Sequence, residues 1–185
     1  EKEEWTGLLL ESGKWFPVAP NEEINLQIET VSKENICGIF KKYDVPQEFD
    51  LLSIDIDSFD YWVTKEILTQ YSPRVVMVEV NVRFEPEESW RLKDDPNWDW
   101  NGTKWYGASP MAYKKMLNAA GYTPVYVHVD DMIAIRNDVL EENGLSEPEW
   151  EKVYPHSNVS LYNTHNMGGT QPLVTELNLD EWEKV

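Results

Sequence analysis

The sequence predicts an α/β fold with a mostly parallel sheet that ends in an antiparallel hairpin. Short apolar runs alternate along the chain with segments of helical periodicity, a pattern typical of parallel sheets with helices on both faces. The run FDLLSIDI at 49–56 is almost entirely apolar, as expected of a strand covered on both faces. Near the end, YTPVYVHV and MIAIRND are separated only by Asp130-Asp131, which predicts the hairpin.

Composition favours one folded, acidic protein. The chain has 185 residues, of which 41% are hydrophobic, and 34 Asp and Glu outnumber 16 Lys and Arg, for a net charge of −18. Such a charge disfavours binding to nucleic acid or to anionic membranes. No apolar run approaches the ~20 residues of a membrane span. Cys37 is the single cysteine, which excludes an intramolecular disulfide and, with no signal peptide in view, points weakly to the cytoplasm.

The first half of the chain contains three predicted strands and two helices. We expect the strands at 7–10, 24–31 and 49–56. A helix at 33–43 follows Ser32, which is a suitable N-cap, and ends before Pro46. The second helix covers 58–71, where Ser72-Pro73 ends the helical pattern.

The second half begins with RVVMVEVNV at 74–82, the most β-branched segment and therefore a strand. A polar, tryptophan-rich loop follows at 83–106; loops of this length are usually functional or disordered, and its tryptophans argue against disorder. A helix is expected at 109–120, with Gly121 after its end. We assign residues 1–140 to one α/β domain and 141–185 to an irregular acidic extension with a possible short helix at 147–152.

Polar side chains cluster where the predicted strands end. Because ligands of open α/β sheets bind at the carboxyl ends of the strands, this edge is the expected site. The residues that meet this condition are Glu11, Thr30, Asp55, Asp57, Glu79 and Asn81.

Several segments together resemble a known family. They are WTGLLLE, VSKENICGIFKKYDVPQEFDLLSIDIDSFDYWV, YSPRVVMVEVN, NGTKWYGAS and IAIRNDVL. In order and spacing they resemble the S-adenosylmethionine-dependent methyltransferase-like proteins of the FkbM type, in a branch marked by SIDID(G/S)xDYW and YGAS. The resemblance spans roughly residues 5–140. It implies a Rossmann-like methyltransferase sheet, S-adenosylmethionine as cofactor, and methylation of a hydroxyl on a small molecule or glycan.

The resemblance also implies a glycine-rich cofactor loop after a first strand. No segment of this sequence corresponds to that strand or loop, so we expect an N-terminally truncated version of the fold. Glu11 falls where the family binds the ribose hydroxyls, because two carboxylate oxygens match a vicinal diol. Thr30 and Asp55 join it as expected cofactor contacts at neighbouring strand ends.

Asp55 and Asp57 allow three interpretations. In the first, Asp57 with Ser58 caps the next helix, with Asp60 in its first turn. In the second, the two aspartates, on one face of a strand, contact substrate or take part in catalysis. In the third, they bind Mg²⁺ or Mn²⁺ through oxygen ligands, and this D-x-D pattern occurs in metal-dependent glycosyltransferases.

The remaining candidates concern the acceptor. Glu79, between valines, is expected to have a shifted pKa and is, with Asp57, a candidate general base; the alternative is a glutamate facing solvent. Asn81, Tyr106 and Ser109 are candidate substrate contacts, although Ser109 before Pro110 also fits a simple N-cap. The tryptophans of 83–106 fit two roles, as the wall of an acceptor pocket or, with the C-terminal tail, as a binding surface for a protein partner. The last possibility belongs to the alternative function, a non-catalytic assembly subunit.

Overall fold

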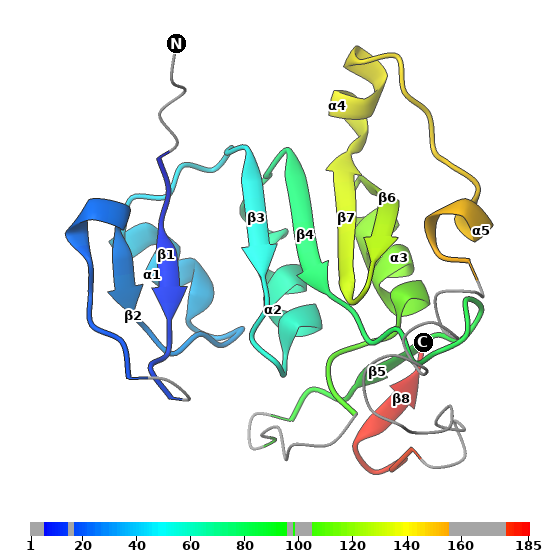
Figure 1. Ribbon diagram of the computed structural model, residues 1–185, viewed down its shortest axis with the longest axis horizontal. Coiled ribbons are helices and arrows are strands. Elements are labelled where there is room, and N and C mark those ends of the chain that lie inside the picture. Colours follow the sequence, from blue (N-terminus) through cyan, green and yellow to red (C-terminus); the bar gives the residue numbers. More distant parts are fainter. Residues whose placement is uncertain (1–5, 15–16, 96–97, 99–104, 156–176) are drawn as a thin grey trace.

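The computed structural model describes residues 6–14, 17–95, 98, 105–155 and 177–185 (Figure 1). It confirms a mixed α/β fold. A central four-stranded sheet has the order β3-β4-β7-β6. Its strands are β3 (Leu51–Ile54), β4 (Val75–Glu79), β7 (Asp131–Arg136) and β6 (Tyr122–His128). Beside it, β1 (Leu9–Glu11) and β2 (Leu26–Ile28) form a separate two-stranded parallel sheet.

The expectation of a mostly parallel sheet needs correction. The predicted hairpin is present as β6 and β7, but its second strand lies between β4 and β6 and pairs antiparallel with both. Only β3 and β4 are parallel neighbours in this sheet. Because β7 runs against both neighbours, β6 still points in the direction of β4. The sheet is mixed because the second strand of the hairpin pairs with β4, which the local sequence pattern does not specify.

The second correction concerns how the sheet is covered. Along β3, Leu52 and Ile54 are buried whereas Leu51 and Ser53 are exposed. This alternation shows one covered face at β3, not the two that its apolar sequence predicts. In Figure 1 the helices α1 (Ile36–Lys42), α2 (Asp60–Ile67) and α3 (Pro110–Ala119) lie behind the strands. No described helix is long and apolar enough to cross a membrane.

The C-terminal part of the chain contributes to the main hydrophobic core. After β7 come two short helices, α4 (Asn137–Glu142) and α5 (Trp150–Val153). Val153 and Tyr154 belong to the same buried cluster as Val76 and Val78 of β4. The Tyr154 hydroxyl donates to the carbonyl oxygens of Val82 and Phe84, at 2.8 and 2.9 Å. Packing therefore continues across the domain boundary that we expected near residue 140.

A small antiparallel sheet joins the tryptophan-rich segment to the end of the chain. Its strands are β5 (Trp90–Leu92) and β8 (Trp182–Lys184), and neither was expected from sequence. Trp182 is 2% exposed and packs in a second hydrophobic cluster with Phe84 and Leu92. The tryptophan loop and the C-terminal tail, both expected to face a partner, thus contact each other in the described residues.

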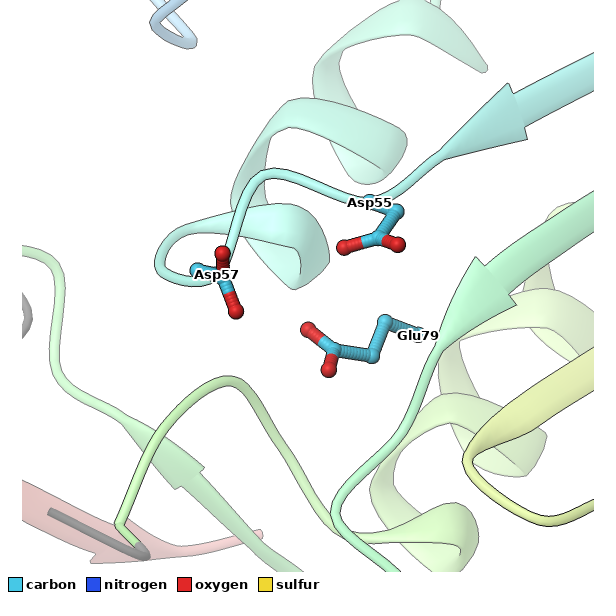
Figure 2. A group of neighbouring side chains, drawn as sticks. All are labelled: Asp55, Asp57 and Glu79. Carbon is cyan, nitrogen blue, oxygen red and sulfur yellow. The ribbon is translucent and has the colours of Figure 1, made fainter. Parts of the chain in front are cut away.

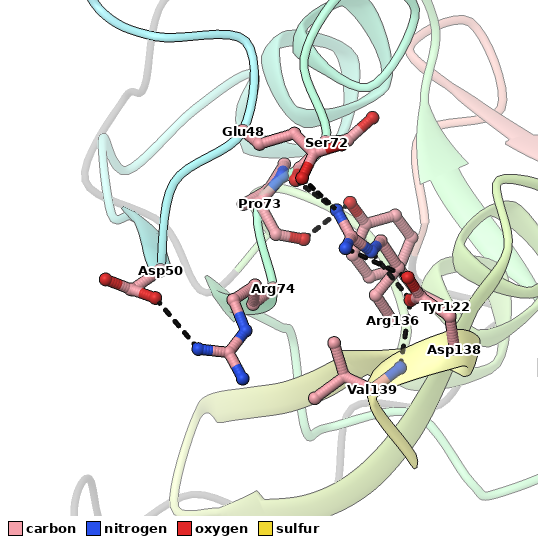
Figure 3. A network of polar contacts seen from close by, with 9 residues as sticks. All are labelled: Glu48, Asp50, Ser72, Pro73, Arg74, Tyr122, Arg136, Asp138 and Val139. Atoms are coloured by element: carbon pink, nitrogen blue, oxygen red, sulfur yellow. Dashed lines mark hydrogen bonds and ion pairs between the residues drawn. The ribbon is translucent and has the colours of Figure 1, made fainter. Parts of the chain in front are cut away.

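Two arginines fix the sheet edge opposite the carboxyl ends of β3 and β4 (Figure 3). Arg136, at the end of β7, donates to both carboxylate oxygens of Asp138 and to the carbonyl oxygen of Ser72. Arg74, just before β4, donates to Asp50 at 3.1 Å. Both arginines are thus paired with aspartates, and these pairs connect neighbouring segments at this edge of the sheet. We therefore assign the edge a role in stability and not in ligand binding.

The buried Tyr154 hydroxyl provides a test of this core. Tyr154→Phe should lower the free energy of unfolding by about 1–3 kcal/mol, because two carbonyl oxygens lose their donor in a buried position. Denaturant unfolding followed by fluorescence measures the change. Tyr126→Phe, at a side chain that is 50% exposed, is the matched control and should have little effect. Equal stabilities of the two variants would contradict the role assigned to Tyr154.

Candidate functional site

The carboxyl ends of the first strands open into one pocket. In Figure 1, β1, β2, β3 and β4 all point the same way. Beyond the first three lies a pocket of about 680 Å³. Its lining includes the four predicted cofactor or metal residues Glu11, Thr30, Asp55 and Asp57. The structure thus brings these four residues, each at or just after a strand end, to one cavity.

Glu11 is held at the mouth of the pocket by a tight turn. Its Oε1 accepts a hydrogen bond from the backbone N–H of Gly13 at 3.2 Å. Gly13 has φ 68°, a left-handed conformation that glycine adopts without strain. By contrast, Glu29 is paired with Lys42 and with the Tyr43 hydroxyl, and these bonds lower its pKa, the one from Lys42 most. Of the two carboxylates at the ends of β1 and β2, Glu29 is held by a cation, whereas Glu11 forms no ion pair with any residue in the described part of the chain.

The turn between β3 and α2 is organised by Asp60. The buried Asp60 carboxylate accepts hydrogen bonds from the N–H groups of Ile56 and Ser58, at 2.8 and 3.0 Å. Burial raises the pKa of Asp60 to about 6, while these two bonds oppose the rise. The expectation that Asp57 caps α2 is wrong, because the residue at the N-cap is Phe59 and no side chain caps the helix there. Asp60, from the first turn of the helix, secures this turn instead.

The side chain of Asp57 points toward two other carboxylates, those of Asp55 and Glu79 (Figure 2). Asp57 has φ 57°, in the left-handed region that aspartate tolerates better than most residues. Figure 2 shows Asp55, Asp57 and Glu79 pointing toward one another. One carboxylate oxygen from each lies within 4.8 Å of the others. This turn conformation, and not alternation along a strand, brings Asp55 and Asp57 together.

Burial and like charge keep Glu79 neutral in the metal-free protein. Burial raises its pKa to about 9, and the charges of Asp60 and Asp55 add to the rise. Burial, followed by the charge of Asp57, also raises the pKa of Asp55. A carboxyl group that is protonated near neutral pH cannot accept a proton. Of the two candidates for general base, the structure therefore favours Asp57 over Glu79.

The three expected substrate contacts lie outside the pocket lining. Asn81 is fully buried, its side-chain amide donates to the carbonyl oxygen of Tyr106 at 3.2 Å, and its Oδ1 accepts from the N–H of Arg83. Ser109 is the N-cap of α3 and accepts from the N–H groups of Ala112 and Trp90. These are structural bonds, so the simple N-cap interpretation is correct for Ser109. None of Asn81, Tyr106 and Ser109 is among the described residues that line the pocket.

Part of the pocket wall is aromatic. Trp98 and Phe59 both line the cavity and meet edge to face, with ring centroids 5.5 Å apart. The Trp98 indole N–H points to Glu181, near the C-terminus, at 3.3 Å. Of the described tryptophans in 83–106, Trp98 lines this pocket, while Trp100 lies outside the described residues.

Sequence reasoning missed three further wall residues. Trp62, on α2, donates to the carbonyl oxygen of Leu92, and the guanidinium of Arg91 stacks over its ring at 4.4 Å. Lys33 forms an ion pair with Asp94, which links the segment before α1 to the tryptophan-rich segment. Lys33, Trp62 and Asp94 all line the pocket. Nothing in the local sequence distinguishes these side chains, which line a pocket, from side chains on an ordinary protein surface.

The pKa of Glu79 predicts how stability depends on pH. Because its folded pKa of about 9 exceeds the unfolded value of about 4.3, the unfolded state loses its proton first as pH rises. The contribution of this group is therefore full at acidic pH and is lost progressively until the pH passes about 9. Urea unfolding in EDTA should show this decline between pH ~6 and pH ~9, at no more than about 1.4 kcal/mol per pH unit.

Glu79→Gln should remove that part of the decline, because glutamine does not titrate. Glu23→Gln, at an exposed residue of the 3-10 helix η1 (Glu22–Ile24), should leave it unchanged. If wild type and Glu79→Gln lose stability in parallel between these pH values, the pKa of Glu79 is not raised.

Comparisons with protein-family models, with curated proteins and with solved structures find no match to this chain. The chemistry of the site is therefore argued from its own residues.

Proposed function

We propose that the chain is an S-adenosylmethionine-dependent O-methyltransferase that acts on a small molecule or glycan. The observation that supports this function best is the meeting of Glu11, Thr30 and Asp55, from three strand ends, in one pocket with aromatic walls. The family resemblance of the sequence points to the same cofactor. The proposal assigns the cofactor to this pocket and the acceptor hydroxyl to the side of Asp57.

The pocket suits a nucleoside cofactor in size and chemistry. Its volume of about 680 Å³ lies within the range of small-molecule sites. Glu11, oriented by Gly13, offers carboxylate oxygens to a ribose diol. Phe59, Trp62 and Trp98 provide aromatic surface for a purine. The acidic lining is complementary to a cationic sulfonium group.

When bound, S-adenosylmethionine supplies a methyl group whose bond to sulfur breaks as a bond to the acceptor oxygen forms. In this proposal Asp57 accepts the proton that the acceptor hydroxyl loses. Asp60 holds the turn that orients Asp57. Phe59 and Trp98 cover the pocket and limit the access of water to the reacting atoms.

Calorimetric titration with S-adenosylhomocysteine tests the cofactor site. Wild type is expected to bind in the micromolar range. Glu11→Gln should weaken binding about tenfold or more, because a charged hydrogen bond contributes about 1.5–3 kcal/mol. The control is Glu23→Gln, which replaces a carboxylate outside the pocket and should bind like wild type. Absence of binding, or equal binding by Glu11→Gln, would contradict the proposal and leave the non-catalytic assembly role in its place.

A metal-dependent glycosyltransferase is the second candidate, because Glu79 adds a third carboxylate to the D-x-D pair of Asp55 and Asp57. The two functions differ in whether the ligand needs a metal ion for binding. A nucleoside diphosphate should bind only with Mn²⁺ present if the second candidate holds, whereas S-adenosylhomocysteine carries no phosphate and needs no cation for binding.

A further inference from the structure

We propose that Asp55, Asp57 and Glu79 bind one hard divalent cation, Mg²⁺ or Mn²⁺, at the inner side of the pocket. The site combines the turn after β3 with the last residue of β4 (Figure 2). The proposal deepens the proposed function, on which it rests for one point alone: the ion's role would be to orient the acceptor hydroxyl.

The first argument is distance. One carboxylate oxygen from each residue lies within 4.8 Å of the other two. Oxygen ligands lie about 2.0–2.6 Å from Mg²⁺ or Ca²⁺, so oxygens up to about 4–5 Å apart can share one ion. A single cation thus reaches all three residues with side-chain adjustments alone. Because the ligands are all oxygens, the site suits hard cations.

The second argument is the sign of the surrounding charge. The side chains next to the site along the chain and across the sheet are also acidic. Glu79 pairs with Asp131 across the ladder of β4 and β7, the N–H of Val80 donates to the carbonyl oxygen of Asp130, and Asp60 holds the turn that carries Asp57. Carboxylates crowded in this way repel one another unless a proton or a cation compensates.

The third and independent argument comes from the interior behind the carboxylates. Tyr113, on α3, is 0% exposed, and its hydroxyl has no hydrogen-bond partner among the described residues. Burial raises the pKa of this hydroxyl most, and the charges of Asp60 and Glu79 raise it further, so it lies within electrostatic range of the same acidic group. The Oε2 atom of Glu79 is likewise buried without a partner. Buried polar atoms of this kind are usually satisfied by an ion or by ordered water.

An ion at this position satisfies these groups together. It coordinates Glu79, and a water molecule in its shell can bridge to the Tyr113 hydroxyl. Asp55 and Asp57 also line the pocket, so the remaining coordination positions face the cavity. An acceptor with a hydroxyl group can occupy one of them beside Asp57.

The test uses Mn²⁺ as probe on the whole chain after removal of metals with EDTA. Electron paramagnetic resonance of free Mn²⁺ gives the stoichiometry and the affinity. Wild type is expected to bind one Mn²⁺, and Mg²⁺ should compete for it. Glu79→Gln and Asp57→Asn should each weaken binding at least ~10-fold, since each removes an anionic ligand. Asparagine is chosen at position 57 because it tolerates the left-handed backbone.

Asp94→Asn is the matched control. It removes one negative charge from the same pocket but lies outside the acidic group, so Mn²⁺ affinity should change by less than ~3-fold. If wild type binds no Mn²⁺ at millimolar concentration, or if all three variants bind alike, the cation site does not exist. Circular dichroism checks that each variant folds. If either Glu79→Gln or Asp57→Asn does not fold, the Mn²⁺ affinity of the other one tests the proposal.

Failure of the cation site is distinguishable from failure of the proposed function. Glu11→Gln should lose S-adenosylhomocysteine and keep Mn²⁺, whereas Glu79→Gln should lose Mn²⁺ and keep S-adenosylhomocysteine. Mn²⁺ binding to a wild-type protein that binds no S-adenosylhomocysteine would overturn the methyltransferase and support the ion site. The reverse result would overturn the ion site alone.

Discussion

The hydrogen bonds of the buried Asp60 carboxylate determine the geometry of the candidate site. By accepting from the N–H groups of Ile56 and Ser58, Asp60 reverses the chain between β3 and α2 within a few residues. This reversal is what puts Asp57 in a left-handed conformation, facing Glu79. Burial of a carboxylate is unfavourable, as its raised pKa shows, and the two backbone bonds offset part of that penalty. The positions of the carboxylates of Asp55, Asp57 and Glu79 relative to one another therefore depend on the buried carboxylate of Asp60.

The distribution of charge separates the two edges of the central sheet. At one edge, Arg74 and Arg136 pair with Asp50 and Asp138 (Figure 3). At the other, the charges that raise the pKa of Glu79 are those of four aspartates. Charge balance favours stability, whereas charge left unbalanced at a pocket favours the binding of a cation or a cationic ligand. The methyltransferase proposal and the cation proposal both draw on this asymmetry.

The aromatic wall of the pocket depends on the end of the chain. Trp98 reaches the cavity from the tryptophan-rich segment, and its indole N–H points to Glu181, just before β8. Trp182 then packs against Phe84, with ring centroids 5.4 Å apart. Strand β8 therefore supports the wall from behind, in addition to pairing with β5. The described residues of this polar segment are thus held by contacts with a segment distant in sequence.

What the sequence by itself determined was local. The alternation of strands and helices, the hairpin, the N-cap at Ser109, and the acids at the strand ends all follow from periodicity, turn chemistry and capping preferences of neighbouring residues. The gathering of Glu11, Thr30, Asp55 and Asp57 could be predicted as well, since parallel strands share a carboxyl edge. The sequence could not decide whether Asp55 and Asp57 bind a metal ion, contact substrate or cap the next helix.

Only the tertiary structure decided which long-range contacts prevail. It placed β7 between β4 and β6, turned Asn81 inward, paired β5 with β8, and gave the securing role to Asp60 instead of Asp57. The raised pKa of Glu79 also required the fold, because burial and the charges of residues distant in sequence cause it. Such contacts depend on competition among many non-local partners, whereas periodicity reports only which face of an element is apolar.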